Sequence, residues 1–472
     1  MAARRQDGTP DQSVGGPTPV VPTASPGDRM AVGKRLRDGV SRASMAAWRP
    51  AKDRPDPLAL LAASDPERIP DLVPVRYGRM LPSPFTFFRG AAAVMAADLA
   101  PSPVTGIRVQ ACGDCHLLNF GGFATPERNV IFDINDFDET LPAPWEWDIK
   151  RLVVSVLLAA RANGWSDDTG RDASVTCARS YRKHMRELAE MHPLERWYAR
   201  IDSEDFISQQ PSAERRAQIR RRIERATEQS GSELDYPRLA QMVGGKIQIR
   251  DTPPLIFHPE QTRDPHFHDE ATATLARYRE TLAEDRRLLF DHYRFVDLAI
   301  KVVGIGSVGR RCWIALLMSS SNHPLFLQVK EAVASVLEPY AGASAHAHPG
   351  QRVVAGQRLM QPASDIFLGW VTGPRGPHYY VRQLRDAKIK PLIETFDPAE
   401  LTTYGKACGW ALARAHAKVG DAWAISGYLG TGGRFEEAMG SFALAYADQV
   451  ERDHHALLAA VKAGKIAVLR EA

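Results

Sequence analysis

The stretch Cys112-Gly-Asp-Cys-His-Leu-Leu-Asn-Phe-Gly121 and its neighbour Ile131-Phe-Asp-Ile-Asn-Asp-Phe-Asp-Glu139 decide the fold expected for this chain. An alternating apolar run leads into the first stretch, so Asp114 is predicted at the junction of a strand and a loop. Asn119 follows five residues later, and a second apolar strand ends at Asp136-Phe. No other part of the sequence has a comparable density of reactive side chains.

Phosphotransferases use this spacing of an Asp, an Asn five residues on, and an Asp-Phe after the following strand. Asp114 is therefore predicted to be the catalytic base that accepts the proton of an attacking hydroxyl. Asn119 and Asp136 are predicted to bind Mg²⁺, which prefers a few oxygen ligands together with phosphates and water. Asp133 stays an alternative to Asp136, because it lies at the more usual distance from Asp114. The alternative interpretation is that these residues form a polar hairpin with acidic side chains at the surface and have no catalytic role.

A glycine-rich turn further along the chain is the predicted phosphate contact. Gly304, Gly306 and Gly309 lie between two predicted strands, and Lys330 ends a third. Glycines let backbone amides approach phosphate oxygens, and a lysine on a later strand can pair with the α- and β-phosphates of ATP. The sequence therefore predicts that these four residues bind the nucleotide, with an ordinary β-turn as the alternative.

Composition narrows the class of protein. The chain has 472 residues, 44 % apolar and 25 % charged, as is usual for a globular protein with room for two lobes. A net charge of +4 on this length does not indicate a nucleic-acid partner. Five cysteines without a secreted pattern favour a reducing compartment. The longest strongly apolar run, 152–160, is about half of what spans a bilayer, and no apolar run follows Arg4-Arg5. A cytoplasmic protein without a membrane partner is expected.

The same survey predicts four regions. Residues 1–45 are expected to be a disordered tail, because the first thirty are rich in Pro, Gly, Ser and Thr. Residues 46–297 are expected to form a helical lobe with the catalytic loop and the metal-binding hairpin. A β-rich nucleotide-binding lobe is expected over 298–390, and C-terminal helices that pack on the catalytic lobe over 391–472.

Apolar periodicity predicts the individual elements. Helices are expected at 85–99, 148–162, 269–290, 352–361, 398–420 and 435–463, with further helices in 166–240. Strands are expected at 104–111, 119–124, 130–135, 297–301, 312–318, 325–330 and 379–384.

Three residues near the Asp114 loop have more than one reading. Asp148 starts the helix after the Asp-Phe strand and is expected either to accept hydrogen bonds from the loop or to cap its own helix. Cys112 and Cys115 form a Cys-x-x-Cys pair, but no second pair or His spacing completes a zinc site.

These motifs together resemble a bacterial family of unknown function, DUF2252, over about residues 40–468. The matching segments are Arg79–Gly90, Gly113–Gly121, Asp136–Glu139 with Pro144–Asp148, Gln328–Ala332, Tyr380–Leu384 and Tyr446–Gln449. The family has no settled activity but looks like a remote relative of the protein-kinase and aminoglycoside-phosphotransferase superfamily. The resemblance implies a two-lobed kinase-like fold of the α+β class, ATP and Mg²⁺ as cofactors, and transfer to a hydroxyl of an unknown, small-molecule acceptor.

One departure from that superfamily bears on the fold. There the glycine loop and the lysine precede the catalytic loop, whereas here they follow Asp114 by about 190 residues. A circular permutation, which is tolerated where chain termini lie close together at the surface, would explain the order. It requires Lys330 to lie near Asp136. Nucleotidyl transfer with an inverted nucleotide is a variant of the same interpretation.

Two other functions compete with the kinase interpretation. A two-metal phosphoesterase would use Gly113-Asp-Cys-His116 and His346-x-His348, although the Gly-Asn-His block of that class is missing. A catalytically inactive nucleotide-binding module is favoured by the lack of a convincing acidic partner for Lys330, for which Glu331 and Glu338 are the candidates.

Overall fold

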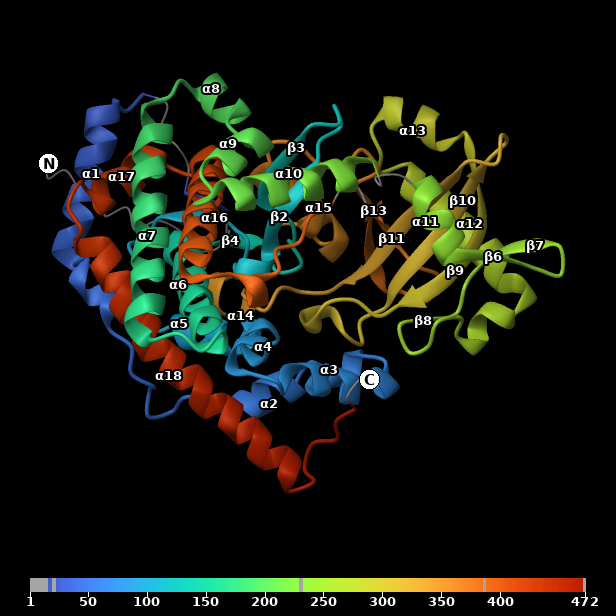
Figure 1. Cartoon of the computed structure of the whole chain (residues 1–472), viewed down its shortest axis with the longest axis horizontal. Coiled ribbons are helices and arrows are strands. Elements are labelled where there is room, and N and C mark those ends of the chain that lie inside the picture. The colour runs from blue at the N-terminus through green and yellow to red at the C-terminus, as the bar shows by residue number, and fades with distance from the viewer. Residues whose placement is uncertain (1–15, 19–22, 229–231, 385–387, 470–472) are drawn as a thin grey trace, which may run out of the picture.

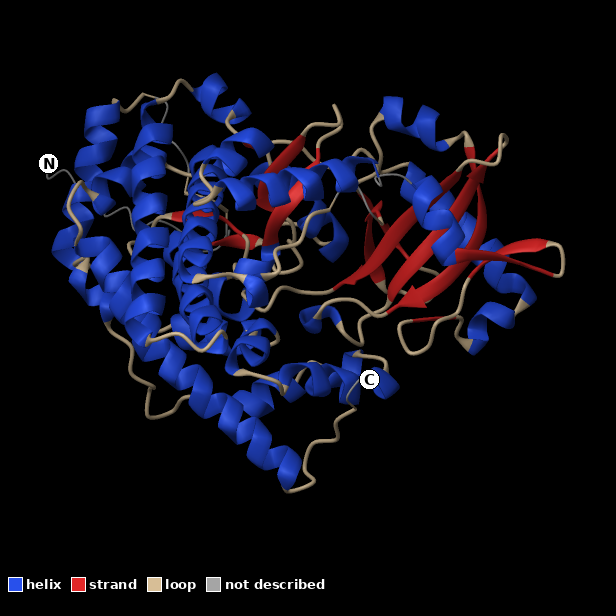
Figure 2. Ribbon diagram, viewed as in Figure 1, coloured by secondary structure: helices blue, strands red, loops and turns tan. Residues whose placement is uncertain are grey.

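The protein has a helical half and a half built around a six-stranded sheet, as Figures 1 and 2 show. The computed structural model describes residues 16–18, 23–228, 232–384 and 388–469. The architecture is mixed α+β, as the sequence predicts. Among the described residues, no helix is both long and apolar enough to cross a membrane.

The helical half is organised around four long helices. They are α6 (Trp145–Ala162), α7 (Asp167–Glu190), α16 (Pro398–Val419) and α18 (Arg434–Lys462). Helix α6 lies in the middle and is buried on all sides over Trp145–Ala160, which explains why its sequence is apolar nearly all round. Trp145 stacks on Tyr181 of α7 with ring centroids 5.7 Å apart. The C-terminal helices α16 and α18 pack against α6 and α7.

The N-terminal segment corrects the predicted tail. Residues 26–39 form helix α1 (Pro26–Gly39), which packs on α17 (Ala422–Leu429). The two helices approach backbone to backbone: a Cβ on Gly33 would lie 1.9 Å from the carbonyl oxygen of Ala424. Arg37 and Arg42 donate to carbonyls at the C-terminal end of α17. Residues 1–15 and 19–22 of the predicted tail lie outside the described residues.

Short elements connect these helices to the site. They are α2 (Pro57–Ala62), α3 (Val73–Met80), α4 (Pro84–Arg89), α5 (Ala92–Leu99), α8 (Pro193–Tyr198), α9 (Ser203–Ser208) and α10 (Ala213–Glu228). The helix predicted at 85–99 is thus two helices. It breaks at Gly90, where a Cβ would lie 2.7 Å from Met80 Sδ and the methionine side chain would have to shift.

Two small sheets carry the Asp114 region. Strand β1 (Arg108–Ala111) pairs antiparallel with β4 (Leu141–Pro144). Strands β2 (Phe120–Ala124) and β3 (Val130–Ile134) form the predicted hairpin, with β5 (Ile201–Asp202) added to its edge. The loop with Asp114 therefore runs from β1 into β2, and the Asp136 segment runs from β3 into β4.

The six-stranded sheet has the order β12-β13-β11-β10-β9-β8. Its strands are β8 (Ile256–Phe257), β9 (Tyr293–Lys301), β10 (Cys312–Ser319), β11 (Pro324–Ala332), β12 (Gly369–Thr372) and β13 (His378–Gln383). Both faces of β10 are buried. Trp313, Ala315 and Leu317 join one apolar cluster and Ile314, Leu316 and Met318 another, which accounts for its unbroken apolar run.

The helices around this sheet correct the predicted boundary at residue 297. Helix α12 (Pro265–Arg279) and helix α13 (Glu284–Phe290) pack in the apolar cluster of the sheet rather than in the helical half. The single helix predicted at 269–290 is thus two. The opposite face is covered by the ribbon of β6 (Ala240–Val243) and β7 (Lys246–Ile249), with α11 (Ser232–Leu239). Short α14 (Glu338–Ala341) and α15 (Pro349–Met360) follow β11.

Candidate functional site

A cavity of about 940 Å³ is lined by residues of both halves. Its wall includes six of the seven predicted site residues, namely Asp114, Asn119, Asp136, Gly304, Gly306 and Lys330. Of the predicted nucleotide contacts only Gly309 is missing from the described lining. Segments that lie nearly 200 residues apart in sequence thus meet around one space.

The backbone of the Asp114 loop is held by Asp148. The amides of Cys112 and Gly113 donate to its Oδ2 and Oδ1 at 2.6 and 2.9 Å. Gly113 has φ +83°, and a Cβ there would lie 2.4 Å from the carbonyl oxygen of Glu139, so the turn requires glycine. His416 of α16 lies with Nε2 3.2 Å from Asp148 Oδ2 and extends this support into the helical half. Of its two predicted roles, Asp148 takes the one that supports the loop.

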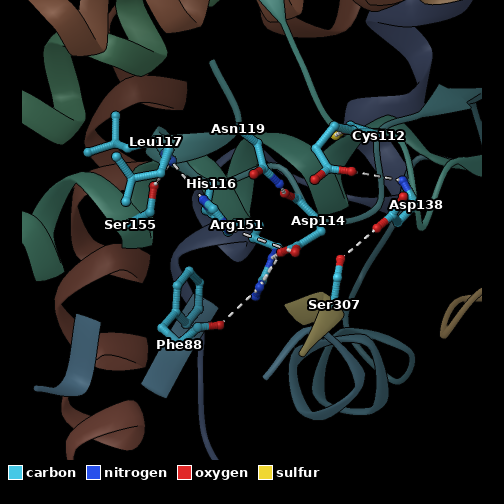
Figure 3. Close-up of polar contacts among 12 residues, drawn as sticks. Phe88, Cys112, Asp114, His116, Leu117, Asn119, Asp138, Arg151, Ser155 and Ser307 are labelled. Atoms are coloured by element: carbon cyan, nitrogen blue, oxygen red, sulfur yellow. Dashed lines mark hydrogen bonds and ion pairs between the residues drawn. The ribbon is translucent and has the colours of Figure 1, made fainter. Parts of the chain in front are cut away.

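One oxygen of Asp114 is engaged and the other is not. Arg151 contacts Oδ1 through both Nε, at 2.7 Å, and a terminal nitrogen. The Nε2 of His116 lies 3.8 Å from Oδ2. Burial raises the pKa of Asp114, and Arg151 opposes that rise. Burial also holds the pKa of His116 well below its usual range, so this imidazole is neutral. Figure 3 shows Arg151 reaching Asp114.

Asn119 and Asp136 have the donor chemistry of a magnesium site. The Nδ2 of Asn119 donates to the carbonyl oxygen of Asp114 at 2.7 Å, which leaves its Oδ1 outside that bond. Burial first, and the neighbouring carboxylate of Asp138 second, raise the pKa of Asp136. A cation would relieve this repulsion. No group of three or more His, Cys, Asp or Glu residues suited to a metal exists within the described ranges, so phosphate and water would have to complete the shell.

The geometry separates Asp133 from Asp136. Asp133 is fully buried, and its carboxylate accepts from Arg414 of α16 at 2.7 and 3.0 Å. It does not line the cavity as described. Only Asp136 of the two is therefore placed to reach a ligand.

Lys330 has an acidic partner that the sequence did not suggest. Its Nζ lies 2.7 Å from Asp138 Oδ2 and 3.7 Å from Asp136 Oδ2. The candidates Glu331 and Glu338 are engaged elsewhere, with Arg311 and with the amide of Ser335. Although burial opposes both effects, the pairing raises the pKa of Lys330 and lowers that of Asp138.

Asp138 is the centre of a small polar network. Tyr380 donates to its Oδ1 at 2.6 Å and Ser307 of the glycine turn to its Oδ2 at 3.0 Å. Arg352 of α15 donates to the carbonyls of Asp138 and Thr140 and holds this segment in place. The contact between Ser307 and Asp138 is drawn in Figure 3.

The glycine turn is pinned to the helical half by arginines. Arg68 donates to the carbonyls of Gly306 and Val308, and Arg79 donates to that of Val303. Gly309 has φ +86° and lies against Arg68, where a Cβ would come within 3.0 Å of the arginine Cβ. The prediction that Gly309 contacts phosphate is therefore corrected: it shapes the end of the turn and packs on Arg68.

Other predicted features lie away from this chemistry. Cys112 and Cys115 are buried and free, and Cys112 Sγ donates to the carbonyl of Asp136 at 3.3 Å. His348 caps α15 and packs against His378 with the two rings tilted, and neither His348 nor His346 belongs to the described cavity lining. The sequence missed Arg151, Asp138 and Arg352, and only Asp138 stood within a motif that could have indicated it.

Positive charge dominates the cavity. Its described wall carries twelve basic and five acidic side chains. The basic residues are Arg68, Arg76, Arg79, Arg89, Arg222, Arg225, Lys301, Arg310, Lys330, Arg382, Lys388 and Lys390. Two of them, Arg76 and Arg310, already pair with Asp65 and Glu67 behind the wall. The remaining excess indicates an anionic ligand.

The fold and site define a mixed α+β protein with a polar, cationic cavity between a helical half and an antiparallel sheet. The family model of "Uncharacterized protein conserved in bacteria (DUF2252)" matches residues 68–460, so the chain belongs to this family. Comparisons with curated proteins and with solved structures each gave no match.

Proposed function

We propose that the protein is an ATP- and magnesium-dependent phosphotransferase that acts on a hydroxyl of a small-molecule acceptor. The observation that carries the proposal is the meeting of Asp114, Asn119, Asp136 and Lys330 in one cavity. These are the residue types, at the sequence spacing, that phosphoryl transfer uses as base, metal ligands and phosphate contact. Lys330 lies 3.7 Å from Asp136, as this function requires.

The topology of the sheet supports a permuted kinase-like fold. The glycine turn joins β9 and β10, and Lys330 lies on β11, so the turn and the lysine occupy three consecutive strands in the order that protein kinases use. Helix α16, late in the chain, contacts the Asp114 and Asp133 regions through His416 and Arg414. A helix that would precede the catalytic loop in an unpermuted chain thus lies beside it in space.

The residues suggest a division of work. Magnesium bound by Asn119 and Asp136 would neutralise charge on the nucleotide phosphates. Lys330 and the backbone of residues 304–307 would contact the phosphates. The acceptor oxygen would form a bond to the γ-phosphorus while the bond to the ADP oxygen breaks, and its proton would pass to Asp114 Oδ2. Arg151 holds Oδ1 and fixes the carboxylate for that transfer.

One observation favours a second function, an inactive nucleotide-binding module. In protein kinases the lysine of the third strand pairs with a glutamate of the following helix. Helix α15 has no acidic residue, and Lys330 pairs instead with Asp138, next to the metal-ligand candidate. A phosphoesterase is not proposed, because His346 and His348 do not line the described cavity.

Thermal unfolding with ATP and Mg²⁺ tests the proposal. Stabilisation of the wild type that needs Mg²⁺ and disappears in Asp136→Ala is expected. Asp205→Ala on α9, an exposed position outside the cavity, is the matched control and should keep the shift. No shift in the wild type would rule out both nucleotide functions. A shift without phosphate transfer across a panel of hydroxyl compounds would leave the inactive module.

A further inference from the structure

Arg89 lines the cavity and has one unsatisfied hydrogen-bond donor. It is the last residue of α4 and lines the cavity wall. Its Nε is buried and has no hydrogen-bond partner in the described structure. A buried guanidinium donor without a partner costs free energy, so the contacts within the protein leave the Arg89 guanidinium incompletely satisfied. Burial lowers the pKa of Arg89, and the negative charge of Asp114 opposes that fall.

The local structure fixes Arg89 relative to Asp114. Arg151 contacts Asp114 and also donates to the carbonyl of Phe88, at 3.0 Å, and its guanidinium lies 4.3 Å from the Phe88 ring centroid. Figure 3 shows Arg151 between Phe88 and Asp114. Ser83 caps the start of α4, and Gly90 packs on Met80 after its end. Arg89 is therefore held by the same contacts that position the candidate base.

The charges of the cavity divide into two groups. Lys330 and Arg382 act on Asp136 and Asp138, where the metal and the nucleotide phosphates are expected. Arg89 and Arg79 belong to the Asp114 side, where the acceptor hydroxyl is expected. Arg79 is engaged with Val303, whereas Arg89 Nε is not engaged. Arg89 therefore supplies a positive charge on the acceptor side that the nucleotide phosphates do not require.

Resting on the phosphotransferase function above, we propose that the acceptor is an anion: a hydroxyl compound with a phosphate or carboxylate group that Arg89 binds while the hydroxyl faces Asp114. A planar guanidinium suits both groups, because it donates two parallel hydrogen bonds to their oxygens. The acceptor hydroxyl is phosphorylated in the step given above, and its anionic group is not changed. Arg89 acts as a specificity-determining residue.

The test uses inorganic phosphate and acetate as probes of the full-length protein. The nucleotide site is first saturated with Mg²⁺ and a non-hydrolysable ATP analogue, and each anion is then titrated by calorimetry. Saturable binding of one anion is expected, and it names the group on the acceptor. Arg89→Gln should weaken it about tenfold or more. Arg277→Gln, which removes the same charge from exposed α12 outside the cavity, should not.

The outcomes separate the two proposals. Nucleotide binding without anion binding, or equal anion affinity in Arg89→Gln, overturns the anionic acceptor and leaves the phosphotransferase intact. Anion binding through Arg89 in a protein that binds no nucleotide overturns the phosphotransferase and, with it, the acceptor assignment. If Arg89→Gln does not fold, wild-type protein is treated with phenylglyoxal and the modified arginines are mapped by mass spectrometry. Protection of Arg89 by the anion is expected, and unchanged labelling overturns the proposal.

Discussion

Asp133 and Asp136 lie three residues apart and have opposite surroundings. Asp133 faces the helical core, fully buried, and one carboxylate meets one guanidinium, that of Arg414. Asp136 faces the cavity beside Asp138, and the two carboxylates share the ammonium of Lys330. The first arrangement is balanced in charge within the protein. The second has like charges close together and room beside them.

The difference shows how a structural acid is told from a candidate ligand-binding acid. A buried pair is kept because removing either partner leaves an isolated charge. Like charges at a cavity are costly in the folded protein itself, so their presence points to a role outside folding. Asp114 is intermediate, because Arg151 occupies one of its oxygens and the other is open to the cavity.

The largest expected effect comes from breaking the buried pair. Arg414→Met should lower the free energy of unfolding by about 3–5 kcal/mol, because Asp133 then loses its buried partner. Lys330→Met, the matched change at the cavity, should cost less, since the side chains of Asp136 and Asp138 are 34 % and 29 % exposed. Urea denaturation measures both. Equal losses would show that the two clusters do not differ in the way described.

The next effect tests the intermediate acid. Asp114→Asn should lower the rate of phosphate transfer to an acceptor by about 10²–10⁴-fold, because the amide cannot accept the proton. Stabilisation by Mg²⁺ and ATP should stay, since Asp114 is not a proposed metal ligand. Transfer is measured with labelled ATP and binding by thermal unfolding. A variant that loses nucleotide binding as well would place Asp114 among the binding residues.

A smaller effect of opposite sign is expected at Asp136. The fold raises the pKa of Asp136, so its ionised form destabilises the folded protein once the pH exceeds that raised value. Without Mg²⁺, Asp136→Asn should therefore raise the free energy of unfolding at pH 8, by at most about 1 kcal/mol because the group is partly screened. The gain should shrink as the pH falls toward the unfolded pKa. Urea denaturation at pH 8 and pH 5 decides, and a loss at pH 8 would contradict it.

The smallest effect is expected at His258, which forms partly exposed ion pairs, in contrast to the fully buried pair of Asp133 and Arg414. His258 lies 2.7 Å from Asp251 and 3.1 Å from Asp297, and the hydrogen bond to Asp297 is the main cause that raises its pKa above 6.5. Its stabilisation should be present below pH 6.5 and disappear as the pH rises through the raised pKa. His258→Asn should thus cost stability at pH 6 and little at pH 9, by under about 1 kcal/mol.

The control is His292→Asn, which makes the same substitution at an exposed histidine after α13. Thermal unfolding in matched buffers at the two pH values is sufficient. A cost that is equal at pH 6 and pH 9 would mean that His258 acts by packing alone.

Much of the site could be predicted from local sequence patterns, because its residues lie in or beside elements that are each formed by one short continuous stretch of chain. The hairpin of β2 and β3, helix α6 and strands β9 to β11 follow from apolar periodicity, and the predicted site residues that line the cavity lie in or beside the hairpin and these strands. The partner of Lys330 could not be predicted in this way. Asp138 lies 192 residues before it, and only the tertiary fold brings the two together.

Helix α1 shows a different limit. Its buried residue is Gly33, and the helix is held by a close backbone approach and by Arg29, which pairs with Asp421. Neither feature produces an apolar stripe, and the stripe is the signal by which a helix is recognised in sequence. The polar composition therefore predicted a disordered tail, whereas arginine side chains and a close contact at a glycine hold this segment as a packed helix.

The pinning of the glycine turn has a mechanical consequence. The chain passes from α10 in the helical half to the ribbon of β6 and β7, and after β13 it continues to α16, so two covalent connections join the halves. The half built around the sheet can therefore rotate relative to the helical half about an axis through these two connections. The hydrogen bonds from Arg68 to the carbonyls of Gly306 and Val308 oppose this rotation. Any motion that separates the glycine turn from the segment that carries Arg68 has to break these bonds first.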